Sequence, residues 1–328
     1  MIDVLRSWGD LGRLPLRDCA DAGLINRTFL AGEPPVYVVQ RVNPLFRPEV
    51  HDDIEAVTAH LAARGMTTPR LLRTDAGALC ALDEEGAAWR VMDFVPGLTV
   101  HRVDSPARAR TAGALVARFH RSVDDLDWDY HHVRPGAHDT ALHMQRLDVA
   151  VKGGEARSVA DGILELWRTW AGRLDGPTRH AHGDLKISNL RFSIDGEGLC
   201  LLDLDTLSRQ PIDVELGDAW RSWCNPVGED GTDTFLDLDL LGAAAAGYRS
   251  ERLLDADDRA ALGGAVERIA LELAARFCRD VVEDNYFGWN AAKFPSRAAH
   301  NLFRAQGQLN LARSARSQRG DIERALGG

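Results

Sequence analysis

The sequence predicts an α+β fold in which a small β-rich lobe precedes a larger helical lobe. A length of 328 residues suits two lobes better than one core. Short β-branched and aromatic runs fill the first hundred residues, and long helical patterns fill most of the remainder. Pro96-Gly97 separates the two parts. We therefore expect the first lobe at residues 1–94 and the second at 95–328.

The composition is that of an ordinary soluble protein, with 45% apolar and 27% charged residues. A net charge of −10 argues against a nucleic-acid partner, which requires a basic surface. The five cysteines are dispersed, as is typical of a reducing compartment. The N-terminal residues lack the apolar core of a signal peptide, and no apolar run reaches the roughly 20 residues that span a membrane. We expect a cytoplasmic protein without a membrane partner, and the sequence leaves its oligomeric state open.

The elements of the first lobe follow from runs of β-forming residues and one helical pattern. The runs 27–32 and 34–42, separated by Gly-Glu-Pro-Pro, predict a hairpin. Residues 47–65 predict a helix, because Ile54, Val57 and Leu61 recur at helical spacing. Short strands are expected at 70–74, 78–83 and 89–95.

The second lobe begins with a helix at 105–123, where Ser105 is the expected N-cap and Pro106 the first helical residue. Later amphipathic patterns predict one helix at 257–282 and a last helix at 296–316.

The segment HGDLKISN, residues 182–189, contains the residue types that phosphoryl transfer requires. That reaction needs a carboxylate to orient and deprotonate the attacking hydroxyl, oxygen ligands for Mg²⁺, and a cation facing the phosphoryl group. Asp184 is the candidate base, Lys186 the candidate cation and Asn189 a candidate metal ligand.

A hairpin is expected directly after this segment. The runs LRFSI and LCLLDLD, at 190–194 and 199–205, are joined by the turn sequence DGEG. Such a hairpin would return Asp203 beside Asn189, where the two could share a metal. Asp205, two residues further on the same strand face, could support that metal.

These motifs resemble the catalytic and metal loops of the aminoglycoside phosphotransferase and choline kinase family, which has the protein-kinase-like fold. Further segments, from GLINRTFL near residue 23 to HNLFRAQGQLNL near residue 311, are similar to its N-acetylhexosamine 1-kinase branch. That resemblance implies an enzyme that uses ATP and Mg²⁺ to phosphorylate the anomeric hydroxyl of an N-acetylated hexosamine.

The resemblance also implies a nucleotide site. Arg41, where protein kinases have Lys, would contact the α- and β-phosphates and pair with Glu55. The loop from Gly23 to Thr28, including Asn26, would cover the phosphates, and the backbone of Met92 to Phe94 would bind adenine.

Residues for the acceptor sugar follow from the same resemblance. Asp218 and Arg221 stand in the segment GDAWR, and Arg276 and Tyr286 match a family segment near the sugar. Gly288 stands where the family usually has Lys, and the spacing is one residue shorter.

Two other function classes remain open. A kinase of the same fold could act on a cationic substrate such as an aminoglycoside, with the acidic run Asp237 to Asp239 near its site. A non-catalytic pseudokinase is favoured only by the Arg at position 41. The histidines form no zinc signature, and Trp220 and Trp223 are expected to pack in the core.

Overall fold

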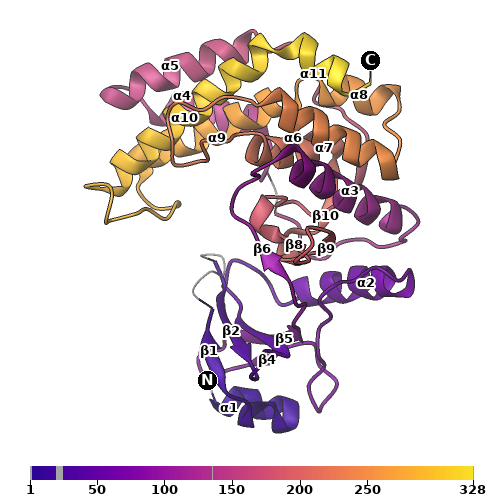
Figure 1. Cartoon of the computed structure of the whole chain (residues 1–328). Coiled ribbons are helices and arrows are strands. Elements are labelled where there is room, and N and C mark those ends of the chain that lie inside the picture. Colours follow the sequence, from indigo (N-terminus) through magenta and orange to yellow (C-terminus); the bar gives the residue numbers. More distant parts are fainter. Residues whose placement is uncertain (1, 20–24, 135, 328) are drawn as a thin grey trace. The chain divides into compact units, whose positions relative to one another are not determined.

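The computed structural model describes residues 2–19, 25–134 and 136–327. The chain divides into two compact units (Figure 1). The sheet unit contains Met1–Leu98, Ser122–Val133 and Arg191–Ser208, and the helical unit contains Thr99–Arg121, Arg134–Leu190 and Arg209–Gly328. None of the helices in the described ranges has the length and apolar character needed to cross a bilayer.

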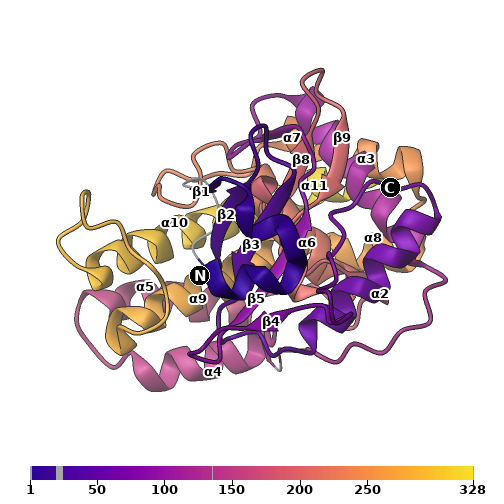
Figure 2. The ribbon, with the colours of Figure 1, turned by 90° about the horizontal axis from the view of Figure 1, so that it is seen from below.

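The sheet unit contains a five-stranded antiparallel sheet in the order β1-β2-β3-β5-β4, and Figure 2 shows β2, β3 and β5 side by side. The predicted hairpin is confirmed, because β2 and β3 pair along their length. The strands are β1 (Leu16–Asp18), β2 (Arg27–Ala31), β3 (Tyr37–Arg41), β4 (Ala81–Leu82) and β5 (Ala88–Asp93). The strand expected at 70–74 is reduced to a single bridge from Leu71 to Met92.

The two faces of this sheet have different partners. On the outer face, Phe29, Val39 and Trp89 pack with the N-terminal helices α1 (Ile2–Leu5) and η1 (Arg6–Arg13), which the sequence did not predict. Because side chains alternate along a strand, the opposite residues form the inner face. Its residues are Thr28, Leu30, Val38, Gln40, Arg90 and Met92.

Two later segments belong to the sheet unit, although the division at residue 94 assigned them to the helical lobe. The first, Ser122–Val133, is held by Asp53 of α2 (Val50–Ala63), which accepts hydrogen bonds from Trp128 Nε1 and the amides of His131 and His132. The second, Arg191–Ser208, is held by Asp205, which accepts hydrogen bonds from Arg90 of β5 and from Asn26. Such long-range bonds cannot be read from local composition.

The hairpin predicted after residues 182–189 is confirmed. It consists of β8 (Leu190–Phe192) and β9 (Gly198–Leu201), and with β6 (Leu98–Thr99) it forms a sheet in the order β6-β8-β9. Asp203 and Asp205 do not lie on a strand, contrary to the prediction. Beyond β9 the chain enters a short 3₁₀ turn, η3 (Leu204–Thr206), preceded by Asp203 in the left-handed conformation with φ 60°.

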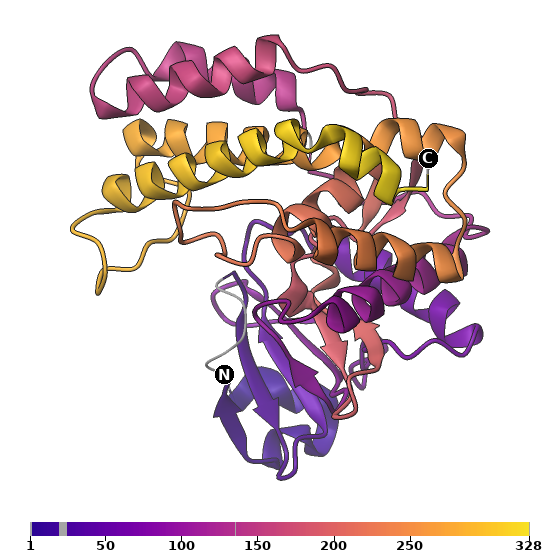
Figure 3. The same ribbon diagram turned by 45° about the horizontal axis from the view of Figure 1, so that its top comes forward.

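The helical unit is built around α9, which α10, α6 and α4 contact, and Figure 3 shows α9 and α10 side by side. The expected N-cap is confirmed, since Ser105 Oγ accepts a hydrogen bond from the amide of Arg108. The helix predicted at 257–282 is two helices, because the consecutive Gly263 and Gly264 interrupt it. The helices are α3 (Pro106–Val123), α4 (Thr140–Ala150), α5 (Glu155–Arg168), α6 (Ile212–Trp223), α7 (Leu238–Glu251), α8 (Ala256–Leu262), α9 (Ala265–Glu283), α10 (Arg297–Ser317) and α11 (Arg319–Ala325). Two short strands, β7 (Thr178–Ala181) and β10 (Ser208–Pro211), pair with each other.

Candidate active site

The helical unit brings three of the predicted residues together. After β7, the chain runs through His182, Gly183 and Asp184 into the 3₁₀ turn η2 (Ile187–Asn189). Lys186 Nζ lies 2.7 Å from Asp184 Oδ2, and Asn189 Nδ2 donates to the same oxygen at 3.1 Å and to the Asp184 carbonyl at 2.8 Å. The spacing Asp-x-Lys-x-x-Asn therefore forms one compact polar cluster.

Glu215 of α6, which the sequence did not predict as part of the site, holds this loop by hydrogen bonds to its backbone. Glu215 is 3% exposed, and its carboxylate accepts hydrogen bonds from the amides of His182 at 2.7 Å and Gly183 at 2.9 Å. It also lies 3.3 Å from His120 Nε2. His182 Nδ1 in turn accepts from the amide of Asp184 at 3.2 Å, so this histidine braces the loop. The only sequence signal was an acid between the buried apolar residues Val214 and Leu216.

The charges in the cluster keep Asp184 ionised. Burial alone would raise its pKa, but the Lys186 ammonium, together with His182 and the Asn189 amide, outweighs burial and holds the pKa below its ordinary value. An ionised carboxylate can accept the proton of a hydroxyl group.

The donor chemistry of two predicted ligands fits Mg²⁺. The amide group of Asn189 donates to Asp184, so its Oδ1 end points away from that carboxylate. Asp203 in the sheet unit offers a carboxylate, and oxygen ligands of these two types are those that Mg²⁺ prefers. Within the described ranges, no group of three or more His, Cys, Asp or Glu side chains could hold a metal by itself.

Asp205, the third predicted metal residue, is paired within the sheet unit. Its carboxylate is 1% exposed and accepts hydrogen bonds from both terminal nitrogens of Arg90, with Nη2 at 2.8 Å, and from Asn26 Nδ2 at 2.7 Å. Burial would raise the pKa of Asp205, but Arg90 and Asn26 lower it, so the carboxylate remains ionised. Both oxygens are thus committed to the protein, which argues against a ligand role.

The predicted pair of Arg41 and Glu55 is wrong. Arg41 lies at the end of β3 on the outer face, where it binds Asp83 Oδ2 at 3.3 Å and Glu85 Oε2 at 2.6 Å. Glu55 of α2 is paired instead with Arg70 and Arg73. The cause is strand parity, since a shift of one residue along β3 moves a side chain to the opposite face.

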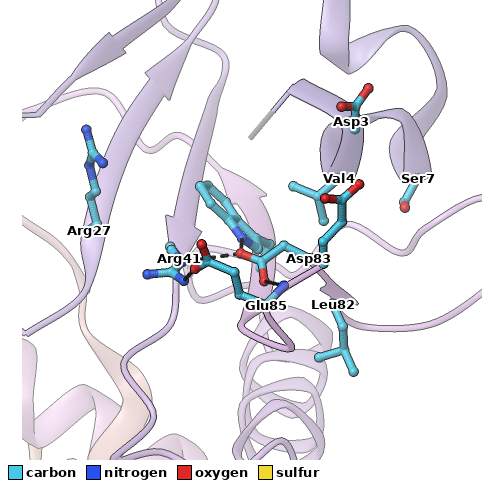
Figure 4. A pocket seen from close by; sticks show the side chains of 10 residues that line it. Asp3, Val4, Ser7, Arg27, Arg41, Leu82, Asp83 and Glu85 are labelled. Atoms are coloured by element: carbon cyan, nitrogen blue, oxygen red, sulfur yellow. Dashed lines mark hydrogen bonds and ion pairs between the residues drawn. The ribbon is translucent and has the colours of Figure 1, made fainter.

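Arg41 lines a pocket of about 650 Å³ on the sheet unit (Figure 4). The figure shows Arg41 directed at Asp83 and Glu85. Trp89 Nε1 donates to the same Asp83 carboxylate at 2.8 Å. The hydrogen bond from Trp89, together with the amide of Ala87 and Arg41, lowers the pKa of Asp83 to about 2. The guanidinium of Arg41 is therefore held by carboxylates on the face opposite to Gln40.

The inner face offers an apolar surface next to polar groups. Leu30 pairs with Val38 and Val38 with Met92, so three half-buried apolar side chains lie in adjacent strands. At the other end of this face, Gln40 Nε2 donates to Thr28 Oγ1 at 3.0 Å. A face that is apolar at one end and polar at the other has the chemistry to receive a purine base at Leu30, Val38 and Met92, with phosphates towards Gln40 and Thr28.

Two details of the predicted nucleotide contacts change. The amides of Asp93 and Phe94 donate to the carbonyls of Arg70 and Val36, so neither amide is available to adenine. Asn26 is held by Asp205 and by the amide of Asn43. Gly23, the first residue of the predicted phosphate loop, lies outside the described residues.

The predicted acceptor residues form two clusters in the helical unit. In α6, Arg221 Nη2 binds Asp218 Oδ1 at 2.9 Å, and Glu229 approaches the same guanidinium at 3.4 Å. Burial would lower the pKa of Arg221, but Asp218, Glu229 and Asp184 raise it. The charge of the candidate base therefore acts on this arginine.

The second cluster surrounds Tyr286, which is 49% exposed. Its hydroxyl accepts hydrogen bonds from Arg276 Nη2 at 3.3 Å and from Arg134 Nη2 at 3.0 Å. Arg276 also lies over the rings of Tyr286 and Phe287. The sequence analysis missed Arg134, which is 152 residues from Tyr286 and carries no local signal.

The segment that carries Tyr286 is anchored by Asp280 of α9. This buried carboxylate accepts hydrogen bonds from three successive amides, those of Asn285, Tyr286 and Phe287, and from Asn301 Nδ2 of α10. A single side chain thus fixes where the segment leaves α9.

Comparison with known proteins gives the family and the fold. The sequence profile of the phosphotransferase enzyme family matches residues 20–254. A microcompartment-associated aminopropanol kinase has a similar structure, with 17% identity, a TM-score of 0.66 and 97% of each chain covered. The GDP complex of wild-type aminoglycoside 2′-phosphotransferase-IIIa gives 12% identity, a TM-score of 0.62 and coverage of 94% of this chain and 96% of that one. The amicoumacin kinase hAmiN, solved in complex with AMP-PNP, Ca²⁺ and Ami, gives 14% identity, a TM-score of 0.60 and coverage of 90% of this chain and 87% of that one. These likenesses confirm the predicted kinase-like fold, with a small antiparallel sheet and a helical lobe.

Proposed function

Because the chain belongs to the phosphotransferase enzyme family, we propose that it transfers the γ-phosphoryl group of ATP to the anomeric hydroxyl of an N-acetylated hexosamine. The observation that carries this proposal is the cluster of Asp184, Lys186 and Asn189. A pseudokinase would have no need to keep this carboxylate ionised and bonded to both partners. The intact cluster therefore favours an enzyme.

In the proposed reaction, Asp184 accepts the proton of the attacking hydroxyl group. The oxygen of that hydroxyl group forms a bond to the γ-phosphorus as the bond from the γ-phosphorus to ADP breaks and ADP leaves. Lys186 balances negative charge beside that carboxylate. Asn189 and Asp203 would hold a divalent cation, which when bound neutralises the charge of the phosphates. The inner face, with Leu30, Val38 and Met92, would receive the base.

The charges near the acceptor residues support a neutral sugar over an aminoglycoside. Arg134 and Arg276 both donate to Tyr286, and neither forms an ion pair with any carboxylate that the structure describes. Two such guanidinium groups repel a polycation, whereas they can donate to sugar hydroxyls and to an acetamido carbonyl. We therefore assign Arg276, Tyr286, Asp218 and Arg221 to sugar binding and add Arg134.

An aminoglycoside remains the second candidate, because several structures of similar fold are aminoglycoside phosphotransferases. The two candidates differ in the position phosphorylated and in the charge of the acceptor. A reaction panel can therefore separate them.

The test is to incubate the protein with Mg²⁺ and either ATP or GTP, to offer N-acetylhexosamines, unacetylated hexoses and aminoglycosides, and to follow release of the nucleoside diphosphate. We expect turnover of an N-acetylhexosamine to its 1-phosphate, seen by phosphorus NMR as a phosphate coupled to H1. The 1-O-methyl glycoside, which has no anomeric hydroxyl, should not react. A 6-phosphate product would contradict the proposed position, and preferred turnover of an aminoglycoside would support the second candidate. Asp203→Ala should abolish the metal-dependent reaction.

A further inference from the structure

The inner face of the sheet lacks a cation at the position where protein kinases place one. In those enzymes a lysine on the third strand pairs with a helix glutamate and binds phosphate oxygens. Here the inner-face residue near the end of β3 is Gln40, because Arg41 lies on the outer face with Asp83 and Glu85. Directly opposite Gln40, on β5, stands Arg90. The arginine of this face therefore comes from the neighbouring strand.

All three guanidinium nitrogens of Arg90 donate hydrogen bonds within the protein. It is 1% exposed, and its Nε and Nη2 donate to Gln40 Oε1 at 2.9 and 2.7 Å. Its Nη1 and Nη2 donate to the two oxygens of Asp205. A fork of this kind fixes the plane of the carboxylate as well as its position. A guanidinium held this way binds the chain, and it cannot reach a phosphate without breaking a buried ion pair.

A second group completes the clamp on Asp205. Asn26 donates to Asp205 Oδ2 at 2.7 Å, and its own Oδ1 accepts from the amide of Asn43 at 2.9 Å. Asp205 is thus fixed to β5 through Arg90 and to the chain preceding β2 through Asn26. No further protein group is needed to satisfy this carboxylate.

What the clamp fixes is the segment that starts at Asp203. Asp203 has φ 60° and ψ 59°, a left-handed conformation that few residues other than glycine, asparagine and aspartate adopt. It directly precedes the 3₁₀ turn η3, in which Asp205 is the second residue. Holding Asp205 therefore holds a short, tightly wound turn, and with it the direction of the Asp203 carboxylate.

We propose that Arg90 is a positioning residue for the divalent cation: by clamping Asp205 it fixes the turn that presents Asp203, and Asp205 is the anchor of that turn and not a metal ligand. This inference rests on the proposed function, which gives Asp203 a cation to bind. It makes Arg90, and not Arg41, the strand arginine on which metal binding depends.

The test compares Arg90→Met, Arg90→Lys and Asp205→Asn with a matched control, Arg268→Met. Arg268 also forms a buried ion pair, with Asp213, but in the helical unit. Two properties are measured without turnover: binding of Mn²⁺ in the presence of ADP, followed by electron paramagnetic resonance, and hydrogen exchange of the amides of residues 202–207.

We expect Arg90→Met to weaken Mn²⁺ binding at least tenfold and to speed exchange in residues 202–207. Arg90→Lys keeps the charge but loses the fork, so its effect should be smaller. Arg268→Met should lower the melting temperature while the folded protein retains wild-type Mn²⁺ binding. The double variant Arg90→Met/Asp205→Asn should bind Mn²⁺ no more weakly than the weaker-binding of the two single variants, because both changes remove the same ion pair.

Other outcomes have distinct meanings. Wild-type Mn²⁺ binding in folded Arg90→Met would overturn the inference, and so would strictly additive losses in the double variant, because Asp205 would then act on the metal independently of Arg90. If Arg90→Met does not fold, Asn26→Ala removes the other half of the clamp, and unchanged Mn²⁺ binding in that variant would equally overturn the inference. A wild-type protein that binds no Mn²⁺ with ADP would instead refute the proposed function.

Discussion

Lys186 Nζ lies 2.7 Å from Asp184 Oδ2, so the candidate cation and the candidate base form an ion pair with each other. The pair is partly exposed, with 37% of the Lys186 side chain and 29% of the Asp184 side chain accessible. An incoming hydroxyl can therefore reach the carboxylate. Lys186 can in turn move towards a phosphoryl group while Asn189 continues to hold Asp184.

Replacing Asp184 by Asn should lower kcat by about 10²–10⁴-fold, the range expected for a positioned general base. The change preserves the size of the side chain and removes its ability to take a proton. Steady-state kinetics of ADP release measure the effect. Asp161→Asn, at an exposed ion pair on α5, is the control and should retain wild-type kcat. Near-wild-type turnover in Asp184→Asn would rule out its role as the base.

Replacing Lys186 by Met should move the acidic limb of the pH–rate profile to higher pH. Lys186 is the main group that lowers the pKa of Asp184 against the effect of burial. In the wild type, the base thus stays ionised, and activity persists, to a lower pH than an ordinary aspartate would allow. Without the ammonium the pKa of Asp184 rises, so protonation removes activity earlier as the pH falls.

The profile of kcat/KM between pH 4 and pH 8 tests this shift, and it is separate from any loss in the maximal rate. Lys152→Met, at an exposed residue just beyond α4, should leave the profile unchanged. A variant profile that coincides with the wild-type profile after scaling would contradict the assignment.

Replacing Arg41 by Ala should leave the KM for ATP within about twofold of the wild type, since exposed ion pairs contribute little and this side chain points to the outer face. ATP titrations at saturating acceptor measure it. Arg27→Ala, at the residue opposite Arg41 in β2, is the matched control. A tenfold rise in KM that is confined to Arg41→Ala would restore the phosphate role predicted from the sequence.

Replacing Glu215 by Gln should destabilise the protein by about 1–3 kcal/mol, because one of the two backbone amides it binds loses its acceptor in a buried site. Since those amides belong to His182 and Gly183, kcat should fall as well. Urea unfolding and kinetics on the same samples test both effects. Glu251→Gln, which affects only pairs with Arg118 and Arg121, should cost less than about 1 kcal/mol. A stable Glu215→Gln variant with full activity would show that the brace is dispensable.

The parts of the site that sequence reasoning predicted are those whose contacts are local. Asp184, Lys186 and Asn189 meet within five residues of chain, so their spacing is enough to define the cluster. The hairpin after Asn189 and the N-cap at Ser105 also follow from short patterns.

The features that could not be predicted depend on which face of a strand a side chain occupies or on contacts between residues far apart in the sequence. Arg41 and Gln40 are neighbours in sequence, yet they lie on opposite faces, and the pattern YVVQR does not show which face is buried. Arg90 and Asp205 are 115 residues apart, and Arg134 and Tyr286 are 152 apart. No local pattern links such residues, so neither the ion pair of Asp205 nor the contact of Arg134 with Tyr286 could be predicted.

The attachment of the Tyr286 segment through Asp280 has a consequence for how acceptor preference can change. Three amides in succession depend on one carboxylate, and that carboxylate belongs to a helix in the core of the helical unit. Residues after Phe287 take no part in this attachment, although Gly288 accepts a hydrogen bond from Arg304 and Phe294 stacks on His300. Directed evolution of new acceptors should therefore vary the exposed residues between Trp289 and Lys293 and leave Asp280 and Asn301 untouched.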